Sequence, residues 1–543
     1  MQPIVDATLR QTLATLYTNL GRYDDARPLL EFALATRRRV LGEEHVDTLR
    51  SLNDMGNLFE MQGGFVEAEP FYRGAYEARL RVRGAEHADT LASMSNLGGN
   101  LRFQGRLDEA EPLLRECLAL SQRVFGAERR ETLIAMNVMG YLLIDQGKLA
   151  EAEPYWREAY ETGRRVLGAD DTDALVWTNN LGGLLASLGR AKEAEPYYRE
   201  AYEGTRRVKG VEHPGTLHCA SSVASNLQSQ GRYAEAEPLC RELLAIRRRV
   251  LGDEHPDTLS SMQSLGGVLR RQGRLAEAEP LLRKPLEVNR RVLGPEHRDT
   301  LTSASILASL LATGEQIGEA EALYREVLAN SRAVWNDDHP DRLITLNNLG
   351  NLLVQQEKLS EAEPMLRAMF DARKRVSGDE HPETLIAQSS VAAVLERQGK
   401  LAEAEALYRD ALGKFRRVLG DAHTNTLSSI GNVAGVLITQ ARFAEAEPLL
   451  REVVAGYERA LGGGHARVGN ARRSLGRVLL GLQRYVEAET ELLAAERVLS
   501  IAQGVSAERK KACVDALIEL YEAWEKVEPD KGHAAAAAKW RAR

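Results

Sequence analysis

Histidine recurs along this chain at one fixed interval. Nine histidines, from His45 to His465, lie on a 42-residue grid, and the two vacant grid points hold Arg129 and Asp171. No insertion or deletion interrupts these eleven consecutive points. A repeat of this length predicts a solenoid or a similar array, in which each repeat contacts only its neighbours. The chain of 543 residues is also too long for one compact core.

The grid can be extended toward both ends of the chain. Backward extrapolation reaches Pro3 and forward extrapolation reaches Ala507, and the segments that follow both points fit the pattern, the second one loosely. The sequence therefore predicts twelve 42-residue repeats over residues 1–506. A degenerate capping repeat and a tail are predicted over residues 507–543.

Each repeat carries the pattern of two helices. In the repeat 255–296, apolar residues spaced by three and four run from Leu259 to Leu269 and again from Leu275 to Val292. That spacing follows one face of an α-helix. The small residue Gly266 is expected to let the two helices approach closely.

The ends of these helices are marked by capping residues. Asp257 and Thr258 are the predicted N-caps of the first helix, and Gly273 and Gly294 follow the two helices as C-terminal glycines. A proline such as Pro280 follows Glu-Ala-Glu in most repeats. We expect it at the edge of the first turn of the second helix, where proline costs little.

Composition excludes several classes of partner. The net charge is −7, from 71 basic and 78 acidic residues, which gives no reason to expect nucleic acid or an anionic membrane surface. No apolar run approaches 18 residues and the N-terminus lacks the pattern of a signal peptide, so we expect a cytoplasmic protein without a membrane span. Four scattered cysteines without a CxxC motif are expected to be reduced thiols.

The recurring segments HPDTL, NNLGNLL, QGRLAEAEPLLRE and RRVLG resemble the tetratricopeptide repeat family. The resemblance is to its 42-residue variety, found in kinesin light chains and in bacterial signalling proteins. It implies an all-α fold, an α-solenoid superhelix of about thirteen tetratricopeptide-like helix pairs. HEAT and armadillo repeats, which have similar lengths, are the alternative fold. The repeats begin at once here, without the heptad coiled coil of kinesin light chains, and no kinase or ATPase domain accompanies them.

No constellation of residues predicts catalysis, a cofactor or a metal site. Histidines that recur at equal spacing cannot converge on one site in a solenoid, so we expect them to cap or staple the loops between repeats. The kinase-like tetrapeptide at His297 to Thr300 lacks the other kinase motifs, and no phosphate-binding GxxxxGK[ST] motif exists. His218, Cys219 and Cys240 lack the further ligands that zinc needs. The chain is therefore predicted not to be an enzyme.

A row of short polar side chains recurs eight residues after the grid point. The resemblance implies that the first helix of each repeat lines a concave groove and that this position faces it. Carboxamides can bond both the N–H and the C=O of an extended backbone. The row consists of Asn53, Ser95, Asn137, Asn179, Ser221, Gln263, Ser305, Asn347 and Ser389. A structural interpretation stays open beside this one, in which these side chains bond the neighbouring helix instead.

Further candidates lie near this row. Four residues later the side chains are mostly small, with Asn57 and Asn351 as the carboxamides, and charges such as Arg270 and Arg271 stand beside them. The predicted groove residues are Asn53, Asn57, Asn96, Asn137, Asn179, Gln263, Arg270, Arg271, Asn347 and Asn351.

These patterns predict a protein–protein interaction scaffold or adaptor. It would hold a peptide segment of a partner protein in its concave groove, with no cofactor. The alternative is a regulatory or sensor module that acts with a separately encoded kinase or ATPase.

Overall fold

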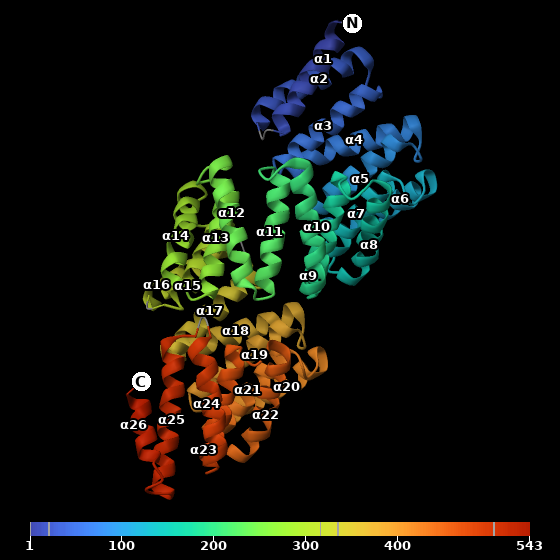
Figure 1. Ribbon diagram of the computed structural model, residues 1–543. Coiled ribbons are helices and arrows are strands. Elements are labelled where there is room, and N and C mark those ends of the chain that lie inside the picture. Colours follow the sequence, from blue (N-terminus) through green and yellow to red (C-terminus); the bar gives the residue numbers. More distant parts are fainter. Residues whose placement is uncertain (1, 20–21, 315, 334–335, 503–504, 543) are drawn as a thin grey trace. The chain divides into compact units, whose positions relative to one another are not determined.

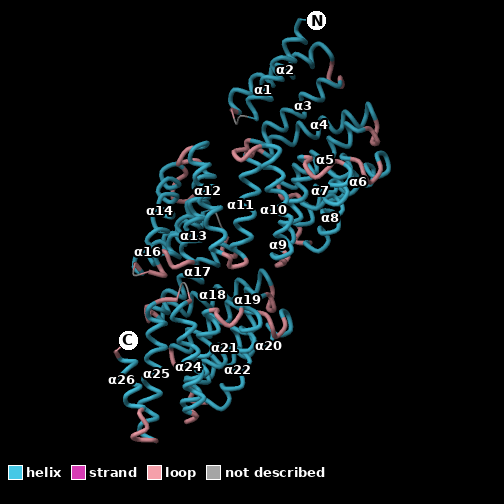
Figure 2. The backbone as a smooth tube through the Cα atoms, viewed as in Figure 1, coloured by secondary structure: helices cyan, strands magenta, loops and turns pink. Residues whose placement is uncertain are grey.

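The computed structural model describes residues 2–19, 22–314, 316–333, 336–502 and 505–542. These residues form 26 α-helices and one short 3-10 helix, Ser331–Ala333, and contain no strand (Figures 1 and 2). The helices alternate along the chain, and we call the first helix of each pair A and the second B. Thirteen pairs follow one another on the 42-residue grid, which confirms the predicted all-α solenoid.

The A helices follow the grid residues. They are α1 (Gln2–Asn19), α3 (Val46–Met61), α5 (Ala88–Phe103), α7 (Arg130–Asp145), α9 (Thr172–Ser187), α11 (Pro214–Ser229), α13 (Pro256–Arg271), α15 (Arg298–Leu311), α17 (Pro340–Gln355), α19 (Pro382–Arg397), α21 (Thr424–Thr439), α23 (Ala466–Gly481) and α25 (Ala507–Val527).

The B helices follow the tight turns after the A helices. They are α2 (Tyr23–Leu41), α4 (Phe65–Arg83), α6 (Leu107–Phe125), α8 (Leu149–Val166), α10 (Ala191–Lys209), α12 (Tyr233–Leu251), α14 (Leu275–Val292), α16 (Ile317–Asn330), α18 (Leu359–Ser377), α20 (Leu401–Leu419), α22 (Phe443–Leu461), α24 (Tyr485–Ile501) and α26 (His533–Arg541).

The grid histidines cap the A helices. His255 precedes α13, and its Nδ1 accepts the backbone N–H of Asp257 at 3.2 Å. The predicted N-caps Asp257 and Thr258 are therefore wrong, because the helix begins earlier, at Pro256. All nine grid histidines accept such a bond and Asp171 accepts two, whereas Arg129 makes no side-chain cap bond. The structural role expected for the histidines is confirmed.

The threonine that stands three residues after the N-cap histidine plays a different structural role. The Thr300 hydroxyl donates to the backbone carbonyl of Gly294 at 2.7 Å, and Thr426 does the same to Gly420. These glycines end the preceding B helices with positive φ, of 90° at Gly294 and 78° at Gly420. The threonine thus ties the left-handed turn to the next A helix.

The proline of the B helices lies deeper than predicted. Pro280 is the sixth residue of α14, beyond the first turn, and the helix continues through it. A proline there leaves one helical hydrogen bond unmade. The expected position at the edge of the first turn is wrong, because α14 already begins at Leu275.

Glycine sets the distance between the two helices of a repeat. A Cβ atom at Gly266 in α13 would lie 2.6 Å from Cδ2 of Leu282 in α14. No carbon pair tolerates this separation, so the helices can pack this closely only around a glycine. The expected role of Gly266 is confirmed.

The chain divides into two compact units, Met1–Ile246 and Arg247–Arg543. Within each unit helices that follow one another along the chain pack together, as α3 does with α4 and α23 with α24 (Figure 1). Leucine and alanine side chains dominate the buried core. Among the described residues, successive A helices such as α5 and α7, or α17 and α19, also contact one another. The A helices of a unit therefore present a continuous surface.

Candidate functional site

The exposed surface of the A helices is formed by four positions of each repeat. Counted from the N-cap, these are offsets 5, 8, 9 and 12, and we call the surface they form the A face. In α17 they are Ile344, Asn347, Asn348 and Asn351, each partly or fully exposed. Spacings of three and four residues bring them to one side of the helix. The other side of α17 is buried and apolar, for example at Leu349.

The predicted carboxamide row connects neighbouring A helices. Nδ2 of Asn96 in α5 donates to Oδ1 of Asn53 in α3 at 2.8 Å. Asn180 in α9 donates in the same way to Asn137 in α7 at 2.8 Å. These bonds run from offset 9 of one repeat to offset 8 of the repeat before it.

The second unit repeats this arrangement. The Ser390 hydroxyl in α19 donates to Oδ1 of Asn347 in α17 at 3.0 Å. Nε2 of Gln263 in α13 donates to the Ser303 hydroxyl in α15 at 2.8 Å. The structural interpretation of the row therefore holds at these positions. The bonds to Asn53, Asn137 and Asn347 engage the amide oxygen, which leaves their N–H groups directed to donate elsewhere.

The row is not uniform, however. Ser221 and Ser389 bond carbonyl groups of their own helices, both at 2.9 Å. Asn179 is only 9% exposed, and its Oδ1 is buried without a hydrogen-bond partner among the described residues. Its burial makes Asn179 a poor contact for a ligand, although the sequence places it in the same row as Asn137.

The remaining predicted residues occupy the rim of the A face. Asn57 is exposed and accepts the Tyr72 hydroxyl at 2.7 Å, and Asn351 is exposed and donates to Asn347 at 3.2 Å. Arg270 donates to the Ser309 hydroxyl at 3.0 Å, while its neighbour Arg271 is exposed at the end of α13.

Cavities open on the A face of both units. In the first unit, Asp54, Asn57 and Glu60 line a cavity of about 250 Å³. Burial raises the pKa of both the Asp54 and the Glu60 carboxyl group. Beside it, Arg102 pairs with Asp145 at 2.6 Å. This end of the A face is therefore the charged one.

The second unit holds three cavities beside its A helices. The cavity nearest the capping loops, of about 300 Å³, lies between α13 and α15 and includes Asp257 and Asp299 in its lining. The other two are lined by more of the A face. One, of about 250 Å³, lies among α13, α15 and α17, and the other, of about 340 Å³, lies among α17, α19 and α21. Their linings are mostly serine, threonine and asparagine. Asn348 lines the smaller of these two cavities, and Asn351 lines the larger one.

The sequence analysis missed offset 5 and most of offset 9. At offset 9 it named Asn96 alone, although Asn180 and Ser390 also bond the row, and at offset 5 it named no residue, although Ile344 and Ile386 are exposed there. Helical spacing from offsets 8 and 12 was the available signal, because offsets 5 and 9 lie three or four residues away.

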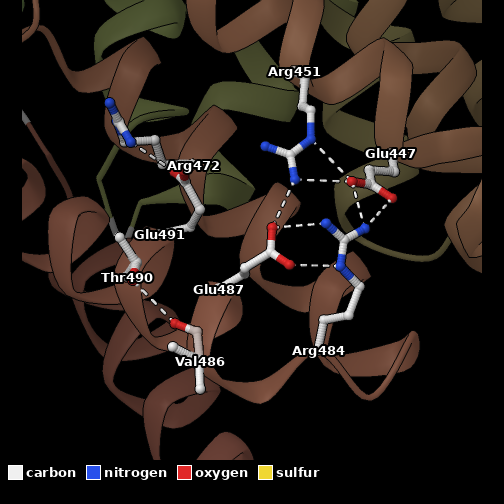
Figure 3. Close-up of polar contacts among 8 residues, drawn as sticks. All are labelled: Glu447, Arg451, Arg472, Arg484, Val486, Glu487, Thr490 and Glu491. Carbon is white, nitrogen blue, oxygen red and sulfur yellow. Dashed lines mark hydrogen bonds and ion pairs between the residues drawn. The ribbon is translucent and has the colours of Figure 1, made fainter.

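The B helices carry a different surface, built from ion pairs. Arg484 at the start of α24 reaches Glu447 of α22 at 2.7 Å and Glu487 of α24 at 2.7 Å (Figure 3). Arg451 of α22 bonds the same two carboxylates, at 2.9 and 3.1 Å. Hydrogen bonds from Arg484 and then Arg451 lower the pKa of Glu487. We call this closed set an ion-pair ring.

Similar rings join other successive B helices. In the first unit, Glu153 and Arg157 of α8 form one with Arg190 and Glu193 of α10. The recurring Glu-Ala-Glu segments of the sequence supply the glutamates of both rings. Their repetition between neighbours indicates a structural role for this surface.

Groups suited to metal binding are lacking in the part of the chain that the structure describes, where no three His, Cys, Asp or Glu side chains converge. All four cysteines are buried and none of them forms a disulfide, and burial raises the pKa of Cys117 to about 11. None of the described helices combines the length and apolar character needed to cross a bilayer.

Comparison with known families accounts for this architecture. The tetratricopeptide repeat pattern matches in overlapping segments that together cover residues 5–500. The chain belongs to the tetratricopeptide repeat family. This family forms a protein-interaction fold, so the chain is a protein-interaction scaffold.

Solved structures share the repeats. A putative kinesin light chain of Podosopora anserina with nearly identical repeats is 26% identical, over 38% of this chain and 99% of that one, with a TM-score of 0.34. BtubC from P. vanneervenii is 20% identical over 42% of this chain and 92% of that one, with a TM-score of 0.37. RapI in its apo form is 14% identical over 68% of this chain and 98% of that one, with a TM-score of 0.50. No curated protein matches the chain.

Proposed function

We propose that this tetratricopeptide protein is an adaptor that holds an extended segment of a partner protein on its A face, and that it has no catalytic activity. The observation that carries the proposal is the run of uncharged hydrogen-bonding side chains on successive A helices, interrupted by cavities large enough for side chains. Extended backbone offers one donor and one acceptor per residue, which such side chains can match.

The hydrogen bonds within the row support this role as well as a structural one. The Asn347 amide is held by Ser390 and Asn351 through its oxygen. An amide fixed in this way loses little rotamer freedom when it binds a ligand, so its N–H group is preorganised to donate. The same contacts therefore position the repeats and orient the donors.

Two further elements of the proposal concern the ends of the array and its location. We propose that residues 507–543 cap the array of twelve repeats, since α26 is short and packs through His533 on Trp524 of α25, with ring centroids 4.1 Å apart. We place the protein in the cytoplasm, where its four thiols, none of them in a disulfide, would stay reduced.

Photo-cross-linking tests the proposed surface. A benzophenone amino acid would replace Asn351 on the A face in one variant and Val486, an exposed residue of α24 on the B side, in a matched control. The proposal predicts that a partner segment is captured from position 351 and not from position 486. Capture only from position 486 would contradict it. The captured protein also distinguishes an adaptor from a module that regulates a separate kinase or ATPase.

A further inference from the structure

Two exposed isoleucines mark the A face of the second unit. Ile344 of α17 is 47% exposed and Ile386 of α19 is 37% exposed, and both occupy offset 5 of their repeats. The neighbouring repeats place Thr302 and Ser428 at the same offset. In the second unit the apolar pair is thus confined to two consecutive repeats, and in the first unit Ile134 and Val176 hold the same offset with similar exposure. An isolated exposed apolar residue would need no explanation.

Each isoleucine lines its own cavity. Ile344 lies in the cavity of about 250 Å³ together with Ile306, and Ile386 lies in the cavity of about 340 Å³ together with Phe415. The two cavities share α17, which supplies Ile344 and Asn348 to the first and Asn351 to the second. They therefore form two sockets that follow one another along the A face.

The floor of the larger socket departs from the pattern of the repeats. In four of the described repeats a polar residue late in the B helix bonds a serine of the next A helix; Arg247, for example, bonds Ser261 at 2.7 Å. At the larger socket this residue is Phe415. The equivalent Ser429 is 2% exposed, and its hydroxyl has no partner among the described residues. An aromatic floor thus replaces the polar contact at this socket, and Tyr457 holds the same position in the next B helix.

The four A-face positions of the helices around both sockets carry no charged side chain. None of the residues at offsets 5, 8, 9 and 12 in α15, α17, α19 and α21 is acidic or basic. The charged lining residues, Arg270 and Asp341, belong to the smaller socket, and Arg270 is bonded to Ser309. A charged partner side chain buried in the larger socket would lose its hydration without gaining an ion partner.

The distance between sockets sets the spacing of their ligands. Adjacent packed helices lie about 8–10 Å apart. An extended chain advances about 3.2–3.4 Å per residue. The smaller socket lies between α15 and α17 and the larger one between α19 and α21, two helix spacings or about 16–20 Å apart. Side chains that enter the two sockets would therefore stand about five or six residues apart.

We infer that the second unit binds an uncharged, extended segment of a partner protein through two aliphatic or aromatic side chains about five or six residues apart, one in each socket. This inference rests on the proposed function and adds the chemistry of the partner. The carboxamides between the sockets bond the backbone of the segment, and Ile344 and Ile386 select its side chains.

Short random peptides displayed on phage and selected on the full-length chain test the inference. The selected peptides should carry few charges and share two aliphatic or aromatic residues about five or six positions apart. Their affinity, measured by fluorescence anisotropy with synthetic peptide, should fall by about tenfold for Ile344→Asn and for Ile386→Asn, as loss of apolar burial predicts. Val418→Asn, at an apolar residue 43% exposed in the last turn of α20, is the matched control and should leave the affinity unchanged.

The outcomes separate this inference from the proposed function. Peptides that bind Ile344→Asn and Ile386→Asn as tightly as the unmodified chain, but weaken with Asn347→Ala and Asn351→Ala, would overturn the sockets and leave the groove in place. Selection of highly charged peptides that bind through the same asparagines would also overturn the sockets and leave binding on the A face in place. Peptides insensitive to every A-face substitution, or a selection that yields no binder, would contradict both.

Discussion

The side-chain amide of Asn180 donates to Oδ1 of Asn137 at 2.8 Å, joining two A helices that are one repeat apart in sequence. The Tyr141 hydroxyl donates to the oxygen of the same Asn180 at 2.9 Å. The polar row is therefore a connection between repeats as well as a surface. This relationship predicts a cost in stability when the row is cut.

Asn137→Ala should lower the free energy of unfolding by about 0.5–1.5 kcal/mol, the net contribution of a typical hydrogen bond. Chemical denaturation followed by circular dichroism measures this change. The matched control is Ser95→Ala, at the same offset of α5, whose side chain forms no bond to the next repeat among the described residues and should leave stability unchanged. Equal effects of both substitutions would show that the bond contributes nothing.

The close contact at the glycine of the A helix predicts that substitutions at two neighbouring glycines change the stability in opposite directions. Gly266→Val should destabilise the chain by about 1–3 kcal/mol, because the new side chain overlaps Leu282. Gly267→Ala should stabilise it by about 0.5–1 kcal/mol, since a Cβ atom there meets nothing within 4 Å and alanine favours the helix. Thermal melts of both variants check the prediction, and a neutral Gly266→Val would refute the close approach.

The histidine caps predict a difference between two replacements. His255→Asp should preserve stability, because Asp171 already caps α9 through two backbone N–H groups. His255→Arg should cost about 1 kcal/mol, the usual price of a lost N-cap bond, as the uncapped Arg129 suggests. Partner binding should stay the same in both. Zinc bound stoichiometrically by the purified chain and lost with His255→Arg would contradict the capping role.

Acid should weaken the contacts between B helices. Hydrogen bonds from Lys358 and then Arg325 lower the pKa of Glu321 to about 2, and bonds from Gln398 and then Arg367 lower the pKa of Glu363 to about 2. The pKa of a glutamate in an unfolded chain is about 4.3. Between this pH and about pH 2, the folded state therefore binds fewer protons than the unfolded state. The stabilisation that these two carboxylates contribute is therefore fully present above about pH 4.5 and is lost as the pH falls toward about 2.

Thermal melts over this pH range test the acid sensitivity. Glu321→Gln and Glu363→Gln should each flatten the fall in melting temperature between about pH 4.5 and about pH 2, because the substituted side chain no longer titrates. An unchanged pH profile in both variants would show that these ion pairs do not stabilise the fold.

The constant repeat length predicts modular stability. Deletion of residues 255–296, one complete repeat, should leave a folded helical protein because the flanking repeats can pack on each other. Deletion of residues 255–274 should unfold the neighbourhood, since α14 would lose its A helix. Equal loss of helical signal in both deletions would contradict the solenoid.

The fold could be predicted because the regular spacing of the histidines from His45 to His465 gives the repeat period directly. The positions of Leu and Gly then identify the buried side of each helix. The helix start at Pro256 was less accessible, because histidine is an unusual N-cap and Asp257 has the more common cap chemistry. Local pattern alone gave a boundary two residues late.

The A face was only partly predictable. Helical spacing identifies which residues share a side, and Asn347 and Asn351 were found in this way. Whether Asn347 meets Ser390 depends on the rotation between repeats, which the periodicity does not determine. The burial of Asn179 and the socket around Ile386 arise from the same packing between repeats, so they emerge only from the structure.

Calorimetric titration with the partner segment captured by cross-linking tests the central claim most directly. Asn347→Ala and Asn351→Ala should each weaken binding by about 0.5–1.5 kcal/mol per folded molecule. Arg451→Ala, in the ion-pair ring of the B helices, should leave the affinity unchanged. Unchanged affinity in both asparagine variants, together with weaker binding by Arg451→Ala, would contradict binding on the A face.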